Sequence, residues 1–167
     1  MRNKGFSIIE LVVVIGVISV LLSIATLNFN AWQRKSLVER FTKELYSDVQ
    51  NARMQAAFTK RPQGVVLGAQ QVTFMSYSSA GDVAGTQVSR KKLPLSFTIN
   101  GTWTPANRID FDTRGMMSNP VPIAKVICFT TTEDAAYDAL IITPALTSMG
   151  KVTNRGNVCA QTNVTQK

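Results

Sequence analysis

Residues 6–27 read FSIIELVVVIGVISVLLSIATL and set the organisation of the chain. Sixteen of these 22 residues are hydrophobic, and Glu10 is the single charged one. As an α-helix the segment would be about 33 Å long, which is enough to cross the hydrocarbon core of a bilayer. The chain of 167 residues as a whole is only 45% hydrophobic, so the residues outside this segment are on average more polar than those inside it. The sequence therefore predicts an apolar N-terminal helix followed by a globular part.

Three interpretations of this apolar segment are open. The first is a secretory signal peptide, with a basic start and a small-residue cleavage site at Ser23-Ile24-Ala25. The second is a plain transmembrane anchor. The third is a short leader that is removed so that the apolar helix stays in the mature protein. Basic residues flank the segment on both sides, so positive charge does not fix its orientation in a membrane.

Glu10 helps to separate these interpretations. A carboxylate costs about 2.5–3.5 kcal/mol at the centre of a membrane helix and less near an end. A signal peptide or passive anchor gains nothing from such a residue. None of the residues from Leu11 to Leu27 is basic, so a charged partner must come from outside this helix. The alternative is that Glu10 lies close enough to the lipid head groups to stay hydrated.

Composition argues against most enzyme classes. The chain has 18 Lys and Arg, 10 Asp and Glu, no His and a formal net charge of +8. The missing His excludes Ser-His-Asp and Cys-His systems and His-ligated zinc. The two cysteines, Cys128 and Cys159, cannot make a four-cysteine zinc site or a Cys-x-x-Cys motif. We therefore expect no enzyme, metal or cofactor, and the positive charge suits either an acidic partner or simple solubility.

A second helical pattern follows the apolar segment directly. Its apolar stripe consists of Leu37, Phe41, Leu45, Val49, Ala52 and Ala56, with Val38 alongside. No Pro or Gly interrupts the pattern before Pro62. The spacing predicts one helix from about Phe6 to Lys60, roughly 80 Å long. Its part over residues 28–61 is amphipathic and packs one face on a domain.

Residues 62–167 alternate short β-prone runs with turn residues. The runs are Gly64–Leu67, Gln71–Tyr77, Thr86–Lys92, Leu95–Asn100, Arg108–Phe111, Lys125–Thr130, Ala139–Ile142 and Lys151–Thr153. Turns are expected at residues 81–82 and 100–101, a loop at 119–122, and a frayed polar C-terminus. The sequence predicts an α+β fold in which an antiparallel β-sheet head packs on the long helix.

Residues 4–11, KGFSIIEL, closely resemble the processing site of type IV pilins and type II secretion pseudopilins. The resemblance implies that prepilin peptidase removes the leader, residues 1–5, by cutting after Gly5. It also implies that the new N-terminal amine of Phe6 is methylated, and that Glu10 pairs with the amine of a neighbouring subunit. That amine neutralises a carboxylate that would otherwise be buried alone. In this family the leader is cytoplasmic, which orients the helix.

The head resembles the GspH/FimT group of minor pilins and pseudopilins. The matching segments are IDFDTRG at residues 109–115, IITP at 141–144 and GKV at 150–152. The resemblance implies a type IV pilin-like fold and a FimU-like minor pilin. Such a protein is anchored once in the inner membrane with its head in the periplasm, and lies in the pilus fibre or tip after assembly. Its implied partners are other minor pilins, the major pilin, prepilin peptidase and the inner-membrane assembly platform.

In an exported head, Cys128 and Cys159 are expected to form a disulfide, and two free buried thiols are the alternative. On the chain-entropy estimate, closing this loop stabilises the head by roughly 3–4 kcal/mol. The bond ties the C-terminal segment to the sheet. A cysteine near the C-terminus is more similar to FimU-like minor pilins than to typical secretion pseudopilins.

Two other functions remain open. One is a type II secretion pseudopilin of the GspH kind. The other is a FimT-like DNA-binding minor pilin, in which Lys151 and Arg155 contact phosphates; no aromatic residue stands between them to stack on bases. A calcium loop at residues 110–115 is not expected, because Arg114 occupies a ligand position and Val121 stands where a bidentate Glu is needed.

Overall fold

The computed structural model describes residues 6–103, 107–118, 124–154, 156 and 158–166. Within this range the side chains of residues 24–28 are not described. The expected cleavage position Gly5, the expected loop at residues 119–122 and the candidate DNA contact Arg155 lie outside the described residues.

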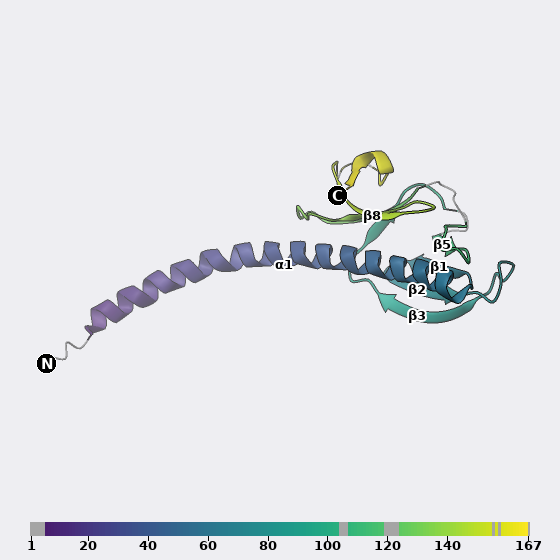
Figure 1. The fold of residues 1–167 in the computed structure, drawn as a ribbon. Helices are drawn as coiled ribbons and strands as arrows, with labels where there is room; N and C mark the ends of the chain where they lie inside the picture. Colours follow the sequence, from purple (N-terminus) through teal and green to yellow (C-terminus); the bar gives the residue numbers. More distant parts are fainter. Residues whose placement is uncertain (1–5, 104–106, 119–123, 155, 157, 167) are drawn as a thin grey trace.

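Helix α1 runs without interruption from Ile8 to Thr59, a length of 52 residues. The expected helix over residues 6–60 is confirmed to within two residues at either end. Lys60 ends it in the left-handed conformation, with φ 55°. Pro62 follows closely, and it has no N–H to continue the helical hydrogen bonds. Figure 1 shows α1 as a long, gently curved rod, with the head on its C-terminal half.

The N-terminal half of α1 projects away from the head (Figure 1). Every described side chain from Phe6 to Ser23 is exposed. Among the residues whose placement is described, no stretch of helix has both the length and the apolarity needed to cross a membrane. The expected apolar segment, residues 6–27, extends into residues 24–28, whose side chains lie outside the description.

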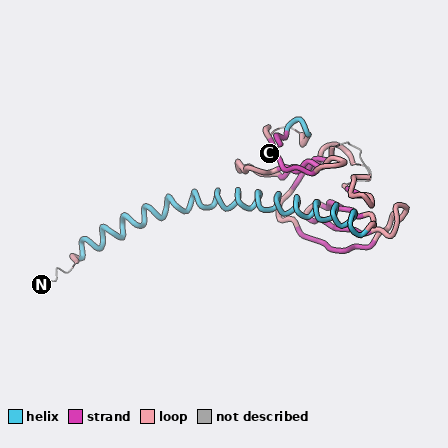
Figure 2. Tube along the Cα trace, in the orientation of Figure 1, coloured by secondary structure: helices cyan, strands magenta, loops and turns pink. Residues whose placement is uncertain are grey.

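The head contains two antiparallel sheets, where the sequence led us to expect one (Figure 2). The first sheet has the order β3-β2-β1-β5, and the second has the order β4-β6-β7-β8-β9. The strands of the first are β1 (Gln63–Gly68), β2 (Gln71–Ser76), β3 (Thr86–Lys92) and β5 (Arg108–Phe111). Those of the second are β4 (Phe97–Ile99), β6 (Lys125–Phe129), β7 (Ala139–Ile142), β8 (Thr147–Val152) and β9 (Val164–Gln166).

Two expectations about the C-terminal region were wrong. The strand expected at residues 151–153 begins at Thr147 and ends at Val152. The C-terminus, expected to fray, forms a 3-10 turn (Gln161–Asn163) and then β9, which pairs with β8. The reason is packing, because Val164 is 8% exposed and lies opposite Val152 in the ladder.

One face of α1 supplies the centre of the core. The buried residues on this face are Val38, Phe41, Leu45, Val49, Ala52 and Ala56, at the three- and four-residue spacing of a helix face. Leu37, which was expected in the stripe, is 36% exposed, and Val38 takes its place. The same hydrophobic cluster includes Val65 and Ile109 from the first sheet and Leu140 and Ile142 from the second. The two sheets therefore share α1 as their common packing surface.

Leucines 37 and 45 provide a matched test of this packing. We expect Leu45→Ala to lower the free energy of unfolding by about 2–5 kcal/mol, because it leaves a cavity in the core. Leu37→Ala makes the same change on the exposed side and is expected to cost below about 1 kcal/mol. Urea unfolding of the full chain in detergent, followed by circular dichroism, measures both. Equal costs for the two variants would contradict the orientation of α1.

Candidate functional site

The N-terminal part of the candidate site lies at the end of α1 farthest from the head (Figure 1). Phe6 precedes the helix and is 83% exposed, and Glu10 lies in the first helical turn. An acidic side chain at this position interacts favourably with the partial positive charge of the helix N-terminus. Both residues are therefore accessible to another molecule without any change in the head.

Arg53 fastens α1 to the second sheet. Its Nη1 donates a hydrogen bond to Pro144 O at 3.1 Å, and its Nη2 donates to Thr143 O at 3.0 Å. The guanidinium also lies 4.9 Å from the centre of the Phe111 ring, which belongs to the first sheet. Burial lowers the pKa of Arg53 from its ordinary value. One side chain of the helix thus contacts both sheets and the loop between β7 and β8.

The segment Ile109–Gly115, which carries part of the family resemblance, has a structural role. Asp112 Oδ1 accepts hydrogen bonds from the backbone N–H groups of Arg114 (2.8 Å) and Met116 (2.9 Å). Gly115 has φ 77°, and a Cβ there would lie 2.9 Å from Arg53 O. Only glycine fits this left-handed position against the helix. Within the described residues no group of three or more His, Cys, Asp or Glu side chains is placed to hold a metal ion.

Polar side chains on other faces of α1 make further attachments to the head. Glu39 Oε1 accepts a hydrogen bond from Ala136 N at 2.8 Å. The Nζ of Lys91 on β3 forms ion pairs with Glu44 and with Asp48, the latter at 2.8 Å. Burial acts to lower the pKa of Lys91, but hydrogen bonds to Asp48 and Glu44 outweigh it, so the pKa is raised. Lys91, the central residue of the basic sequence Arg90-Lys91-Lys92, therefore fastens the edge strand β3 to the helix.

Lys125 is a buried charged residue that the sequence did not single out. Its side chain is 0% exposed, its Nζ donates a hydrogen bond to Arg108 O, and it lies 5.1 Å from the centre of the Trp103 ring. Burial lowers its pKa to about 8, with Asp110 acting to raise it and Arg108 to lower it. The charge is stabilised by one carbonyl, an aromatic face and a nearby carboxylate.

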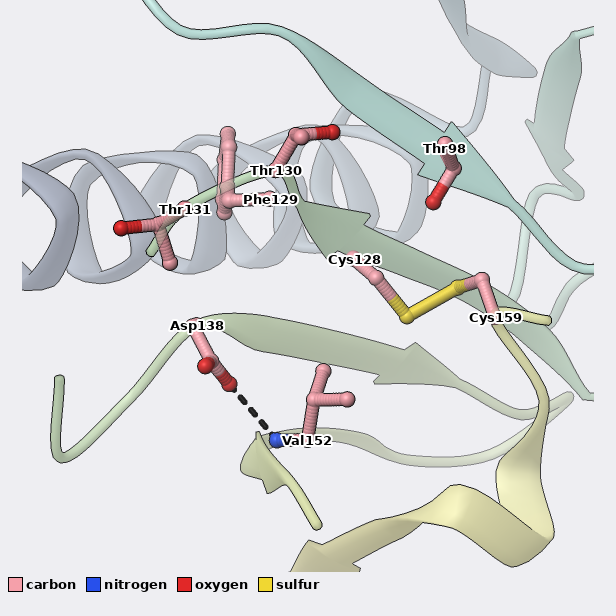
Figure 3. A pocket seen from close by; sticks show the side chains of 8 residues that line it. All are labelled: Thr98, Cys128, Phe129, Thr130, Thr131, Asp138, Val152 and Cys159. Atoms are coloured by element: carbon pink, nitrogen blue, oxygen red, sulfur yellow. Dashed lines mark hydrogen bonds between the residues drawn. A yellow bond between two sulfur atoms is a disulfide. The ribbon is translucent and has the colours of Figure 1, made fainter. Parts of the chain in front are cut away.

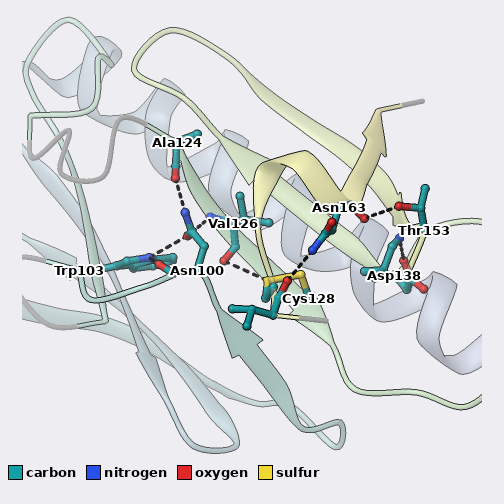
Figure 4. Close-up of a disulfide and its surroundings, with 11 residues drawn as sticks. Asn100, Trp103, Ala124, Val126, Cys128, Asp138, Thr153 and Asn163 are labelled. Atoms are coloured by element: carbon teal, nitrogen blue, oxygen red, sulfur yellow. Dashed lines mark hydrogen bonds between the residues drawn. A yellow bond between two sulfur atoms is a disulfide. The ribbon is translucent and has the colours of Figure 1, made fainter. Parts of the chain in front are cut away.

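A disulfide joins Cys128 on β6 to Cys159 in the C-terminal segment, with Cα atoms 5.9 Å apart (Figure 4). Both cysteines are buried. They belong to a second hydrophobic cluster, with Val126, Ile141 and Val164, on the face of the second sheet opposite α1. The C-terminal segment therefore covers that face, which is why strands β6 and β7 are buried on both sides.

Beside the disulfide is a cavity of about 170 Å³ (Figure 3). Three threonines, Thr98, Thr130 and Thr131, line it together with Asp138. Asp138 is 1% exposed, and its Oδ1 accepts a hydrogen bond from Val152 N at 2.7 Å. This carboxylate holds strand β8 in place.

Asn100 forms hydrogen bonds at the N-terminal end of β6, the end away from Cys128 (Figure 4). Its Oδ1 accepts hydrogen bonds from Val126 N (2.6 Å) and Trp103 Nε1 (3.0 Å), and its Nδ2 donates to Ala124 O at 2.7 Å. The sequence marked Asn100-Gly101 as a turn, and Gly101 does have a positive φ of 58°. The bonds across the sheet were not predictable, because they depend on which strand lies next to this turn.

Lys151, one of the two candidate DNA contacts, has an acidic neighbour. Its Nζ lies 2.7 Å from Asp134 Oδ1. A basic side chain with such a partner loses part of its attraction for a phosphate. The DNA contact at Lys151 therefore stays a prediction, and Arg155 lies outside the described residues.

The chain has a type IV pilin-like fold of the α+β class, and its N-terminal residues carry a prokaryotic methylation motif. Residues 1–26 match the family described as the prokaryotic N-terminal methylation motif. No curated protein sequence matches the chain significantly.

The fold is similar to that of the type IV minor pilin FimU from Pseudomonas aeruginosa (strain PAO1). The TM-score is 0.54 at 12% sequence identity, over 78% of this chain and 97% of that chain. The minor pseudopilin EpsH from the type 2 secretion system of Vibrio cholerae gives a TM-score of 0.47 at 11% identity, over 78% and 94% of the two chains.

Loss of the disulfide tests how strongly the C-terminal segment is held. We expect the double variant Cys128→Ser/Cys159→Ser to lose roughly 3–4 kcal/mol of unfolding free energy, because the unfolded chain regains the freedom of the closed loop. Reduction of the unmodified chain with dithiothreitol should produce a similar loss and leave the double variant unchanged. Urea unfolding of the full chain in detergent measures both, and an unchanged midpoint in the variant would contradict the expectation.

Lys125 gives the head a specific pH dependence. Its folded pKa of about 8 lies below the unfolded value, so the unfolded chain binds more protons above pH 8 and raising the pH favours folding. From about pH 8 to about pH 9.5, the unmodified chain should gain roughly 1.5 kcal/mol of unfolding free energy relative to Lys125→Met. Urea titrations at a series of pH values measure the difference, and parallel pH profiles would contradict the prediction.

Proposed function

We propose that this chain is a minor pilin that takes part in assembling a type IV pilus, as a subunit of the priming or tip complex. The observation that carries the proposal is the division of α1. Its C-terminal half packs one face into a head with a minor-pilin-like fold, and its N-terminal half projects from the head behind a methylation motif.

In this proposal, prepilin peptidase cuts after Gly5, and the amine of Phe6 is methylated. Residues 6–27 then hold the subunit in the inner membrane as a single pass, with the head in the periplasm. The support is the apolar sequence of this segment and its match to the methylation motif. The inner-membrane assembly platform takes up the subunit from there, and it ends in the pilus fibre or tip.

Glu10 is the residue on which assembly depends. A carboxylate in an apolar helix bundle is costly unless an opposite charge neutralises it. The positively charged N-terminal amine of a neighbouring subunit would also be buried in the apolar bundle. When the two groups pair, each lowers the free-energy cost of burying the other's charge. Glu10 is exposed in the first turn of α1, where a neighbouring helix can reach it.

The head acts as a rigid body that contacts other minor pilins and the major pilin. Arg53, Glu39 and Lys91 link α1 to both sheets, so a pull on the helix moves the whole head. A pilus role is preferred to type II secretion on the disulfide near the C-terminus. The subunit has no catalytic part in this scheme.

Glu10→Gln tests the assembly role with little change in size. We expect the variant to be absent from sheared pili while its level in the membrane stays normal, because the neutral amide cannot pair with an amine. Twitching should fall and export of secreted enzymes should stay unchanged if the machine is a pilus. Quantitative immunoblotting of pili and membranes, in a strain without the native gene, provides the measurement.

The matched control is Glu133→Gln, which removes one carboxylate from the head and should assemble normally. Normal amounts of the Glu10→Gln chain in sheared pili would contradict the assembly role. A secretion defect with normal twitching would instead assign the subunit to type II secretion.

A further inference from the structure

Beyond the apolar segment, α1 carries a group of aromatic and basic residues that the packing of the head does not use. We define this collar as Phe29, Trp32, Arg34 and Lys35; Arg40, farther along the helix, instead lies 5.0 Å from the centre of the buried Phe41 ring. The two rings of the collar are 54% and 62% exposed, and their centroids lie 6.0 Å apart in a stacked arrangement. Two large aromatic side chains this exposed on one short stretch of helix mark a contact surface.

The collar has an excess of positive charge. Residues 28–43 contain Arg34, Lys35, Arg40 and Lys43 and a single acid, Glu39. That carboxylate is directed at the head, where it accepts the hydrogen bond from Ala136 N. The ion pairs formed between described residues involve other basic groups, namely Lys91, Arg108, Arg114 and Lys151. The collar therefore presents its positive charge to the surroundings.

The shape of the collar suits small anionic groups better than a partner helix. A shallow groove of about 360 Å³ lies along the helix between Trp32 and Arg40. Its wall includes an indole and the exposed Leu37, and both Arg34 and Arg40 border it. Successive residues of a helix point about 100° apart, so Arg34 and Lys35 face different directions. Positive side chains that point in different directions around the helix can each contact lipid head groups, because the head-group layer surrounds the helix on all sides.

We propose that this collar binds the anionic phospholipid head groups of the membrane that anchors residues 6–27, an inference that rests on the proposed membrane anchoring. Trp32 lies five residues beyond Leu27, which is about 7.5 Å along the axis. The head-group layer on one side of a bilayer is roughly 5–8 Å thick, and Trp prefers this depth. Arg34 and Lys35 lie seven and eight residues beyond Leu27, about 10–12 Å along the axis, so their long side chains extend back to the phosphates.

Removal of residues 1–5 takes Arg2 and Lys4 from the chain, so the collar becomes the main basic cluster beside the membrane segment. In this proposal the collar sets how deeply α1 inserts into the bilayer, and it holds the head close to the bilayer surface before assembly. These contacts must be given up when the subunit leaves the membrane for a fibre.

Trp32 itself reports on the lipids that touch it. The full chain is reconstituted in vesicles of phosphatidylcholine and phosphatidylglycerol, in roughly a nine-to-one ratio so that local enrichment of the anionic lipid is visible. In one preparation the phosphatidylglycerol carries bromine on the acyl carbons nearest its head group, and in the other the phosphatidylcholine does, because Trp32 is proposed to lie at head-group depth. Bromine quenches tryptophan on contact, and Trp103, which is 1% exposed in the core of the head, gives a constant background.

We expect quenching per brominated molecule to be at least threefold greater for phosphatidylglycerol, in line with an attraction of roughly fivefold for each basic residue near the surface. Arg34→Gln/Lys35→Gln should bring this ratio close to one, and so should about 1 M salt, which screens charges beyond about 3 Å. The matched control is Lys60→Gln/Arg61→Gln, which removes two basic residues about 40 Å farther along the chain and should leave the ratio unchanged.

A ratio near one for the unmodified chain, with Trp32 still quenched by both lipids, overturns the collar proposal and leaves membrane anchoring intact. An equal fall of the quenching ratio in Arg34→Gln/Lys35→Gln and in Lys60→Gln/Arg61→Gln also overturns it, because the effect would then follow the net charge of the chain alone. Absence of quenching by either lipid, with the chain failing to float with the vesicles, overturns both proposals together.

Discussion

Burial of one face of α1 between two separate sheets is the contact on which the rest of the structure depends. Neither sheet is closed, and each needs an apolar partner for its inner face. The helix provides that partner for both, because its buried residues recur every three or four positions from Val38 to Ala56. The two sheets also meet directly, since Lys125 Nζ on β6 donates a hydrogen bond to Arg108 O on β5, but α1 provides the apolar surface that both sheets share.

This arrangement gives the two halves of the helix different tasks. The C-terminal half is committed to the head by its apolar face and by Arg53, Glu39 and the carboxylates that pair with Lys91. The side chains of the N-terminal half that the structure describes from Phe6 to Ser23 are exposed and available to lipid or to other helices. Because α1 is continuous from Ile8 to Thr59, any molecule that binds its N-terminal half also sets the position of the head. That mechanical link suits the proposed transfer of the subunit from a membrane into a fibre.

The motif at residues 109–115 shows how a pattern can carry a resemblance without carrying chemistry. Asp112 closes a turn through backbone hydrogen bonds, and Gly115 allows that turn to approach the helix beside Arg53. The restriction on these positions is therefore steric and conformational. The disulfide has a similar structural purpose on the opposite face, where it holds the C-terminal segment over the second sheet.

The sequence by itself determined the features that depend on local periodicity: the long helix, its apolar first half, the buried spacing of the second, and the position of most strands. It also contained the methylation motif at residues 1–26, whose fixed spacing is a local property. Only the tertiary structure decided that the strands divide into two sheets and that Val38 replaces Leu37 in the core. The roles of Arg53 and Lys125 were hidden for the same reason, since a basic residue in a sequence is normally solvated. What buries them is contact with segments up to about ninety residues away in the chain, and no local pattern records such contacts.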